Sequence, residues 1–383
     1  MSAARGSVFK RKGSKAWTVL LDLGVDENGK RRREWHSGFR SKIAAEKART
    51  ELLAGLDAGA HVKPSDLTLR EFVVGTWLPG LRAGSLRPTT VEMYSRSARC
   101  YLLPPLGRVK LCDLSPIRLK GWLDGLRTEG TGARTVQVAY ATAHRALRSA
   151  LDLELIPRNP ADNAEVRAAK PPLRSKAPTV WTAEQTRRFL GSQRDDRLFA
   201  LWRLATMTGA RRGELCGARW RDVDFDSGEL HIRETAVVVN YRVVESTPKT
   251  AASRRTVALD EATVAALRAL RARQSEEMLA FGRRRDDETH LFTCEDGEPL
   301  HPQRLTTMLA ARAKRAGLPV VRFHALRHGH ATAALEAGVP MKVVSDRLGH
   351  SSIVVTANCY SHVTAATDRA AASQIAAAID GAS

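Results

Sequence analysis

The chain has 383 residues, a formal net charge of +20 and a pI near 10.4. This length allows two or three domains, and the charge favours a polyanionic partner, because each neutralised phosphate releases counterions. Five scattered cysteines without a Cys-x-x-Cys pair argue against a disulfide scaffold and a zinc site. We find no membrane-length apolar run and no secretory h-region, so we predict a cytoplasmic protein without a membrane segment.

Residues 1–60 are expected to form a small α+β module. Alternating apolar residues, an Asn-Gly turn and a serine at a helix N-cap favour two strands followed by one helix. The predicted elements are a strand over 16–23, a turn over 26–29, a strand over 30–36 and a helix over 42–56.

The same module is strongly basic, with 13 Lys and Arg against 5 Asp and Glu within positions 1–50. Basic side chains on a small sheet can enter a DNA groove, so we predict DNA contacts from Lys12, Arg31 and Arg33. The tryptophans Trp17 and Trp35 fit either that DNA surface or the core of the module. The run of charge also fits a solvated sheet edge.

Residues 66–165 are predicted to be an all-α bundle of four or five helices, because apolar residues recur there at helical spacing. Ser115-Pro116 opens one of these helices, with the proline at a permitted first-turn position. The apolar residues of this helix that we expect to face inward are Ile117, Leu119, Trp122, Leu123 and Leu126. The last helix of the bundle ends near Leu153, before two prolines.

A basic linker is expected over 166–178, where prolines are frequent and few apolar groups could anchor the chain. Residues 179–383 are then predicted to be a mainly α domain with a three-stranded β insert. The strands expected in the insert are 230–239, 241–246 and 255–259. An alanine-rich helix over 365–379 is expected to pack either on its own domain or on a neighbouring protomer.

Two arginine motifs in the last domain suit phosphate chemistry. Cleavage of a phosphodiester gathers negative charge on the non-bridging oxygens, and fixed guanidinium groups stabilise that charge. Arg211 lies three positions before Glu214 at a helix start, so Glu214 is placed to orient Arg211, and His324 lies three positions before Arg327. Each motif taken alone also fits an ordinary solvated surface pair.

Three further residues complete the candidate chemistry. Tyr360 is a candidate nucleophile, although a phenol with a pKa of about 10 attacks only when its surroundings prepare it. Lys249 lies on a predicted hairpin turn. From there it could donate a proton to a leaving oxygen or contact a DNA groove, and it also fits an ordinary solvated turn lysine. His350 is placed to bond a phosphate or to cap the preceding helix. We find no phosphate-binding loop and no acidic cluster for paired magnesium ions.

In this order the motifs resemble those of the tyrosine recombinase (phage integrase) family. The matching segments are Thr208-Gly-Ala-Arg211-Arg-Gly-Glu214, Thr247-Pro-Lys249, His324-Ala-Leu-Arg327, Leu348-Gly-His350 and Tyr360. The resemblance extends over the whole chain. It implies an arm-type DNA-binding domain over 1–60, a helical core-binding domain over 66–165 and a catalytic domain over 179–383.

The resemblance also implies a role for each matching residue. Arg211 and Arg327 would clamp the scissile phosphate, with Glu214 supporting Arg211. Tyr360 would attack the phosphate and give a 3′-phosphotyrosine and a free 5′-hydroxyl.

Proton transfer is assigned to the remaining matches. Lys249 would protonate the leaving 5′-oxygen. His324 and His350 would bond the phosphate oxygens and assist proton transfer, with His324 the better placed base toward Tyr360. No metal, ATP or other cofactor is expected.

The function implied is that of an integrase that moves an element between double-stranded DNA attachment sites. It would act as a homotetramer through a four-way junction, nucleoid-associated when bound to DNA, with an excisionase and a host DNA-bending protein as candidate partners. A Xer-like chromosome or plasmid dimer resolvase, a type IB topoisomerase and a catalytically silent DNA-binding protein are the alternatives. The basic N-terminal module favours the element-encoded integrase.

Overall fold

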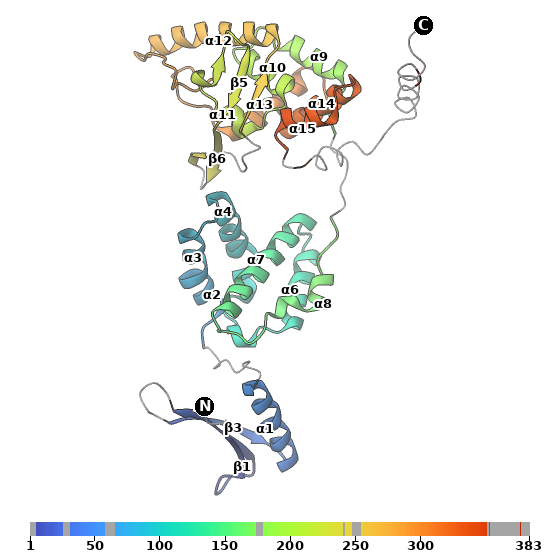
Figure 1. Cartoon of the computed structure of the whole chain (residues 1–383). Coiled ribbons are helices and arrows are strands. Elements are labelled where there is room, and N and C mark those ends of the chain that lie inside the picture. Colours follow the sequence, from blue (N-terminus) through green and yellow to red (C-terminus); the bar gives the residue numbers. More distant parts are fainter. Residues whose placement is uncertain are drawn as a thin grey trace. The chain divides into compact units, whose positions relative to one another are not determined.

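The computed structural model describes residues 5–25, 31–57, 66–173, 179–239, 242–246 and 254–350, together with positions 352 and 376. Several predicted features lie outside these residues: Lys249, Tyr360, the turn over 26–29, the end of the linker over 174–178, and the helix over 365–379 except position 376. The chain divides into two compact units, Met1–Arg174 and Ser175–Ser383 (Figure 1). No helix within the described ranges has the length and apolarity to cross a membrane.

The first unit begins with a three-stranded antiparallel sheet and one helix. The sheet has the order β1-β2-β3, with the strands β1 (Arg5–Lys10), β2 (Trp17–Val25) and β3 (Arg31–Phe39), followed by α1 (Lys42–Asp57). Val19 and Leu21 are fully buried with Ala45 of α1. Strand β1 was not predicted, because its short segment shows little alternation and its pairing with β2 comes only from the fold.

The two tryptophans of the sheet have different surroundings. Trp17 is partly buried and packs against the core that β2 shares with α1. Trp35 pairs with Leu20, which lies on the sheet face opposite Val19 because neighbouring side chains of a strand alternate between faces. Trp35 is 48% exposed. The Trp35 ring lies edge-on to Phe9 at 5.7 Å.

The rest of the first unit is a helical bundle. Its α and π helices are α2 (Leu69–Phe72), the π-helical η1 (Val73–Trp77), α3 (Leu78–Ala83), α4 (Pro88–Ser97), the π-helical η2 (Ala98–Leu102), α5 (Leu103–Leu106), α6 (Pro116–Thr128), α7 (Ala133–Asp152) and α8 (Ala164–Ala168). Two 3-10 turns, η3 (Leu111–Asp113) and η4 (Pro160–Asp162), complete the described part of the bundle. Helix α6 begins at Pro116 as predicted, and Ser115 caps it by accepting the Arg118 N–H at 3.4 Å.

One inward position predicted for α6 is wrong. Leu119, Trp122, Leu123 and Leu126 are buried as expected, whereas Ile117 is 79% exposed. Ile117 lies two positions before Leu119, which is more than half a turn away from the buried stripe at 3.6 residues per turn.

The predicted linker over 166–178 is also wrong in its first part. Helix α8 reaches Ala168, and Val166 and Ala169 are buried in the bundle core. Beyond it, Lys170 lies 4.4 Å from the centre of the Tyr140 ring. Two small apolar residues on one helical turn therefore suffice to anchor a segment whose composition suggested an extended chain.

The second unit is mainly helical. Its helices are α9 (Ala183–Ser192), α10 (Phe199–Thr208), α11 (Arg212–Gly217), η5 (Trp220–Asp222), α12 (Glu261–Ala280), α13 (Pro302–Arg315), α14 (Phe323–Glu336) and α15 (Met341–Leu348). They enclose an apolar core in which Phe189 of α9 and Trp202 of α10 are fully buried. The two rings meet edge-on at 5.8 Å.

The β insert differs from the prediction. Strands β4 (Val223–Asp224), β5 (Glu229–Ile232) and β8 (Arg255–Ala258) form a three-stranded antiparallel sheet, while β6 (Thr235–Val239) and β7 (Arg242–Ser246) form a separate pair. The strand predicted over 230–239 is thus divided at Arg233 and Glu234. Both side chains are drawn to charged partners: Glu234 accepts from Arg221 at 2.7 Å, and Arg233 lies 3.8 Å from Asp222.

Candidate active site

Arg211 and Glu214 form a close ion pair at the start of α11. The Arg211 N–H donates to Glu214 Oε2 at 2.8 Å, and Arg211 Nη1 donates to Oε1 at 2.7 Å. Glu214 is only 4% exposed, so this is no solvated surface pair. The contact expected from the three-residue spacing is present.

Arg255 of β8 is the second partner of Glu214. Its Nη1 and Nη2 donate to Glu214 Oε1 and Oε2 at 3.2 and 3.0 Å. Burial by itself raises the pKa of Glu214, but the hydrogen bonds and charges of Arg255 and Arg211 outweigh it and hold that pKa below its usual value. The sequence prediction assigned Arg255 only to a strand. The one local signal that could have singled out Arg255 is its position two residues before the buried Val257, which places both side chains on the same face of strand β8.

Three guanidinium groups meet the last carbonyls of α15. Arg255 Nε donates to the Arg347 carbonyl at 2.6 Å, Arg327 Nη2 to that of Leu348 at 2.7 Å, and Arg211 Nη2 to that of Gly349 at 2.9 Å. The carbonyls at a helix C-terminus lack partners within the helix and carry partial negative charge, which cations stabilise. This helix end therefore gathers arginines from three distant segments of the chain.

Arg327 is held on a second side as well. Its Nη1 donates to the carbonyl of Gly209, the residue that ends α10, at 2.9 Å. Arg327 is 3% exposed, whereas His324, one turn earlier in α14, is exposed. The three-residue spacing puts both side chains on one face of the helix, but at very different depths.

The histidines of this region are neutral near pH 7. Partial burial, together with the charges of His328 and Arg327, lowers the pKa of His324 to about 4, and its ring meets that of His328 edge-on at 4.9 Å. Partial burial and the charges of Arg327 and Arg211 likewise lower the pKa of His350 to about 4. Each neutral ring keeps a nitrogen lone pair that can accept a proton.

The remaining predicted site residues are not part of this group. Lys249 and Tyr360 lie outside the described residues. Lys12, Arg31 and Arg33 belong to the N-terminal sheet module and are exposed. Arg31 pairs with Asp22 of β2 at 2.9 Å, so part of its charge is already neutralised.

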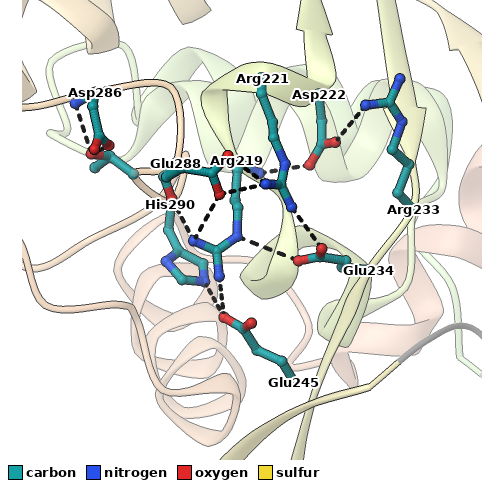
Figure 2. Close-up of polar contacts among 10 residues, drawn as sticks. Arg219, Arg221, Asp222, Arg233, Glu234, Glu245, Asp286, Glu288 and His290 are labelled. Atoms are coloured by element: carbon teal, nitrogen blue, oxygen red, sulfur yellow. Dashed lines mark hydrogen bonds and ion pairs between the residues drawn. The ribbon is translucent and has the colours of Figure 1, made fainter.

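A separate ionic cluster fixes the β6–β7 hairpin. Figure 2 shows Arg219 between Glu234, Glu245 and Glu288, with Arg221 reaching two of the same carboxylates. Glu245 of β7 accepts from Arg219 at 2.5 Å and contacts His290 at 3.1 Å. The end of strand β7, which precedes the segment 247–253 that contains Lys249, is therefore bonded to Arg219 and His290 of the second unit.

Comparison with known proteins gives a consistent result. Residues 181–367 match the family model described as the phage integrase family. The XerC-like tyrosine recombinase of Caldanaerobacter subterraneus subsp. tengcongensis is 31% identical over 376 residues, covering 94% of this chain and 95% of the relative. An integrase of Streptomyces ambofaciens is 28% identical over 351 residues, covering 90% of this chain and 88% of the relative.

Solved structures share the fold. The Tn1549 transposon integrase in complex with transposon right end DNA superposes with a TM-score of 0.67 at 21% identity, covering 81% of this chain and all of that chain (100%). A lambda integrase dimer bound to a COC′ core site gives a TM-score of 0.55 at 19% identity, covering 92% of this chain and 93% of the other.

Proposed function

We propose that this chain integrates and excises a mobile element. The premise is that it belongs to the phage integrase family and is a site-specific tyrosine recombinase. The basic N-terminal module supports this assignment, because its exposed sheet face offers a DNA surface in addition to the catalytic unit. The integrase relative from Streptomyces aligns over 90% of this chain. The XerC-like relative, at 31% identity, favours a second candidate, a Xer-like dimer resolvase.

The proposed reaction begins with the arginines. Arg211 and Arg327 hold the non-bridging oxygens of the scissile phosphate, and Glu214 supports Arg211. Tyr360 attacks phosphorus, a new tyrosyl P–O bond forms, and the bond to the 5′-oxygen breaks. The observation that carries this proposal is the convergence of both guanidinium groups on the end of α15, immediately before His350.

Proton transfer completes the step. We assign the proton of the Tyr360 hydroxyl to His324, whose low pKa leaves it neutral and able to accept. Lys249 supplies the proton to the leaving 5′-oxygen, and His350 bonds a phosphate oxygen. The phosphotyrosine keeps the energy of the broken phosphodiester, so a 5′-hydroxyl from the partner duplex reverses the step without ATP or a metal.

The partners follow from the same proposal. The chain would bind double-stranded attachment sites and act as a homotetramer on two duplexes; a lambda integrase tetramer bound to a Holliday junction has the same fold, with a TM-score of 0.55. Lys12, Arg31 and Arg33 would contact arm-site DNA. An excisionase and a host DNA-bending protein are proposed as accessory partners. The proposed place of action is the nucleoid in the cytoplasm.

A nicked suicide substrate tests the assignment. It carries a candidate core sequence taken from the DNA that flanks the encoding gene, and its nick lets the short fragment with the free 5′-hydroxyl diffuse away after cleavage. Wild type should form a covalent adduct that resists SDS, and Tyr360→Phe should form none. A wild type that yields no adduct would favour a catalytically silent DNA-binding protein, and relaxation of plasmids lacking the core site would favour a topoisomerase.

A further inference from the structure

Glu214 is a buried carboxylate that needs two cations. A single buried carboxylate is costly unless its oxygens accept charged hydrogen bonds. The pair with Arg211 satisfies one side of each oxygen, and the fork of Arg255 supplies the other. Arg255 is a better buried partner than Arg211, since its side chain is 6% exposed against 37% for Arg211.

Arg255 is fully engaged with protein groups. Its Nε donates to the Arg347 carbonyl, and both terminal nitrogens donate to Glu214. In return, Arg347 Nη2 donates to the carbonyl of Ala258 in the same strand at 2.9 Å. Hydrogen bonds in both directions therefore join strand β8 to the end of α15, and the Arg255 side chain is only 6% exposed.

We propose that Arg255 is a positioning residue for the recombination reaction: it holds the Glu214 carboxylate in the orientation in which that carboxylate holds Arg211. The inference rests on the proposed role of Arg211 at the scissile phosphate.

The activity test compares Arg255→Met, Arg255→Lys, Glu214→Gln and the double variant Arg255→Met/Glu214→Gln. Single-turnover cleavage of the suicide substrate by Arg255→Met should slow about ten- to hundredfold, as is typical when a supporting partner is lost. Its DNA dissociation constant should stay at the wild-type value, because the buried Arg255 side chain donates to Glu214 and to the Arg347 carbonyl. Arg255→Lys should recover part of the rate.

Two outcomes of this series would overturn the inference. The double variant should be no slower than Glu214→Gln, because Arg255 acts through Glu214, and additive losses would contradict that. Wild-type cleavage by Arg255→Met would contradict it directly. Arg254→Met is the matched control: it removes the same charge one residue earlier from an exposed side chain, and should weaken DNA affinity without slowing single-turnover cleavage at saturating protein.

A second readout needs no activity. In wild type the folded-state pKa of Glu214 lies below 4.5, so its stabilisation is present above that pH and is lost as pH falls. In Arg255→Met the burial of Glu214 is no longer offset by Arg255, so the folded-state pKa of Glu214 rises. The urea midpoint of this variant should therefore fall further below that of wild type as pH increases from 4 to 7. The Glu214→Gln background should abolish that growth.

The unfolding series also distinguishes failure of the Arg255 assignment from failure of the proposed function. If wild type forms no covalent adduct, the proposed function fails while the unfolding series still decides whether Arg255 acts on Glu214. A difference between wild type and Arg255→Met that does not change with pH, with normal cleavage or without it, would refute the Arg255 assignment.

Discussion

Arg327 donates from Nη1 to the backbone carbonyl of Gly209 at 2.9 Å, which joins α14 to the end of α10. Gly209 has a φ of 62°, in the left-handed region. A Cβ at this position would lie 2.6 Å from Leu348 Cδ2 and 3.0 Å from His330 Cδ2. The bare glycine therefore lets three elements close around Arg327, and a guanidinium fixed by the protein in this way suits stabilisation of a phosphate charge.

Gly209→Ala should both destabilise the protein and slow cleavage. We expect a loss of roughly 2–5 kcal/mol, the sum of left-handed strain and overpacking against Leu348. Urea unfolding measures the first effect, and single-turnover adduct formation at a temperature where the variant is folded measures the second.

Gly282→Ala is the control for that substitution. Gly282 has a φ of +69°, and a Cβ added there would meet nothing within 4 Å, so this variant carries the strain without the clash. Its loss should be about 1–2 kcal/mol, with unchanged cleavage. Equal losses in the two variants would show that close packing at Gly209 is unimportant.

Stability should fall as pH drops from about 6.5 to about 4, through His330. Burial and the charge of Arg347 lower its pKa to about 4, although its ring bonds the Thr206 carbonyl at 3.1 Å. A lowered histidine pKa means that the unfolded chain takes up the proton first. The stabilisation is therefore present above pH 6.5 and is lost below it, by roughly 2 kcal/mol between pH 7 and pH 5. Urea midpoints at pH 7 and pH 5 measure the loss.

His330→Asn keeps a donor toward Thr206 but cannot be protonated. Its midpoint should change less between the two pH values than that of wild type. His324 also has a pKa lowered to about 4, but its side chain is solvent-exposed, so His324→Asn should reduce the pH slope less than His330→Asn does. An identical slope in wild type and His330→Asn would contradict the assignment.

Lys249→Ala should slow cleavage of ordinary DNA far more than cleavage of a substrate with a 5′-bridging thiol. A thiolate leaves without protonation, so a missing general acid matters less, and general acid catalysis is typically worth about 10²–10⁴-fold. Quench-flow on the two substrates gives the ratio. The same factor on both would mean that Lys249 acts in another way.

Deletion of residues 1–60 should spare cleavage at a core site and impair integration that depends on flanking arm sites. Within the module, Arg33→Ala should lower the slope of log affinity against log salt by about one, as expected for one lost phosphate contact. Ile43→Ala, a truncation of an exposed apolar side chain on α1, should not. Full integration by the truncated protein would contradict the arm-binding role of residues 1–60.

Local pattern was sufficient for much of the protein. The Ser115 cap, the buried stripe of α6 and the helix N-terminus at Arg211 depend on neighbours within one or two turns, and each is present. The order of the arginine, histidine and tyrosine motifs was likewise enough to identify the family, because the reaction requires those residue types together.

Pattern alone failed where the deciding partner is distant. Strand β1 exists because it pairs with β2, and the strand predicted over 230–239 is divided because β5 pairs with β4 and β8 whereas β6 pairs with β7. Helix α8 is fixed by a core that its own composition does not reveal. In each case a long-range contact outweighed local preference.

The sequence by itself supplied the residue types of the candidate site: arginines suited to a phosphate, histidines, and a candidate nucleophile. Only the tertiary structure decided how the cations are held. Arg211 and Gly349 are 138 residues apart and Glu214 and Arg255 are 41 apart, so neither contact leaves a periodic trace in the chain. The burial that makes Arg255 indispensable to Glu214 arises only when β8, α11 and α15 pack together, because desolvation depends on neighbours in space and not on neighbours in sequence.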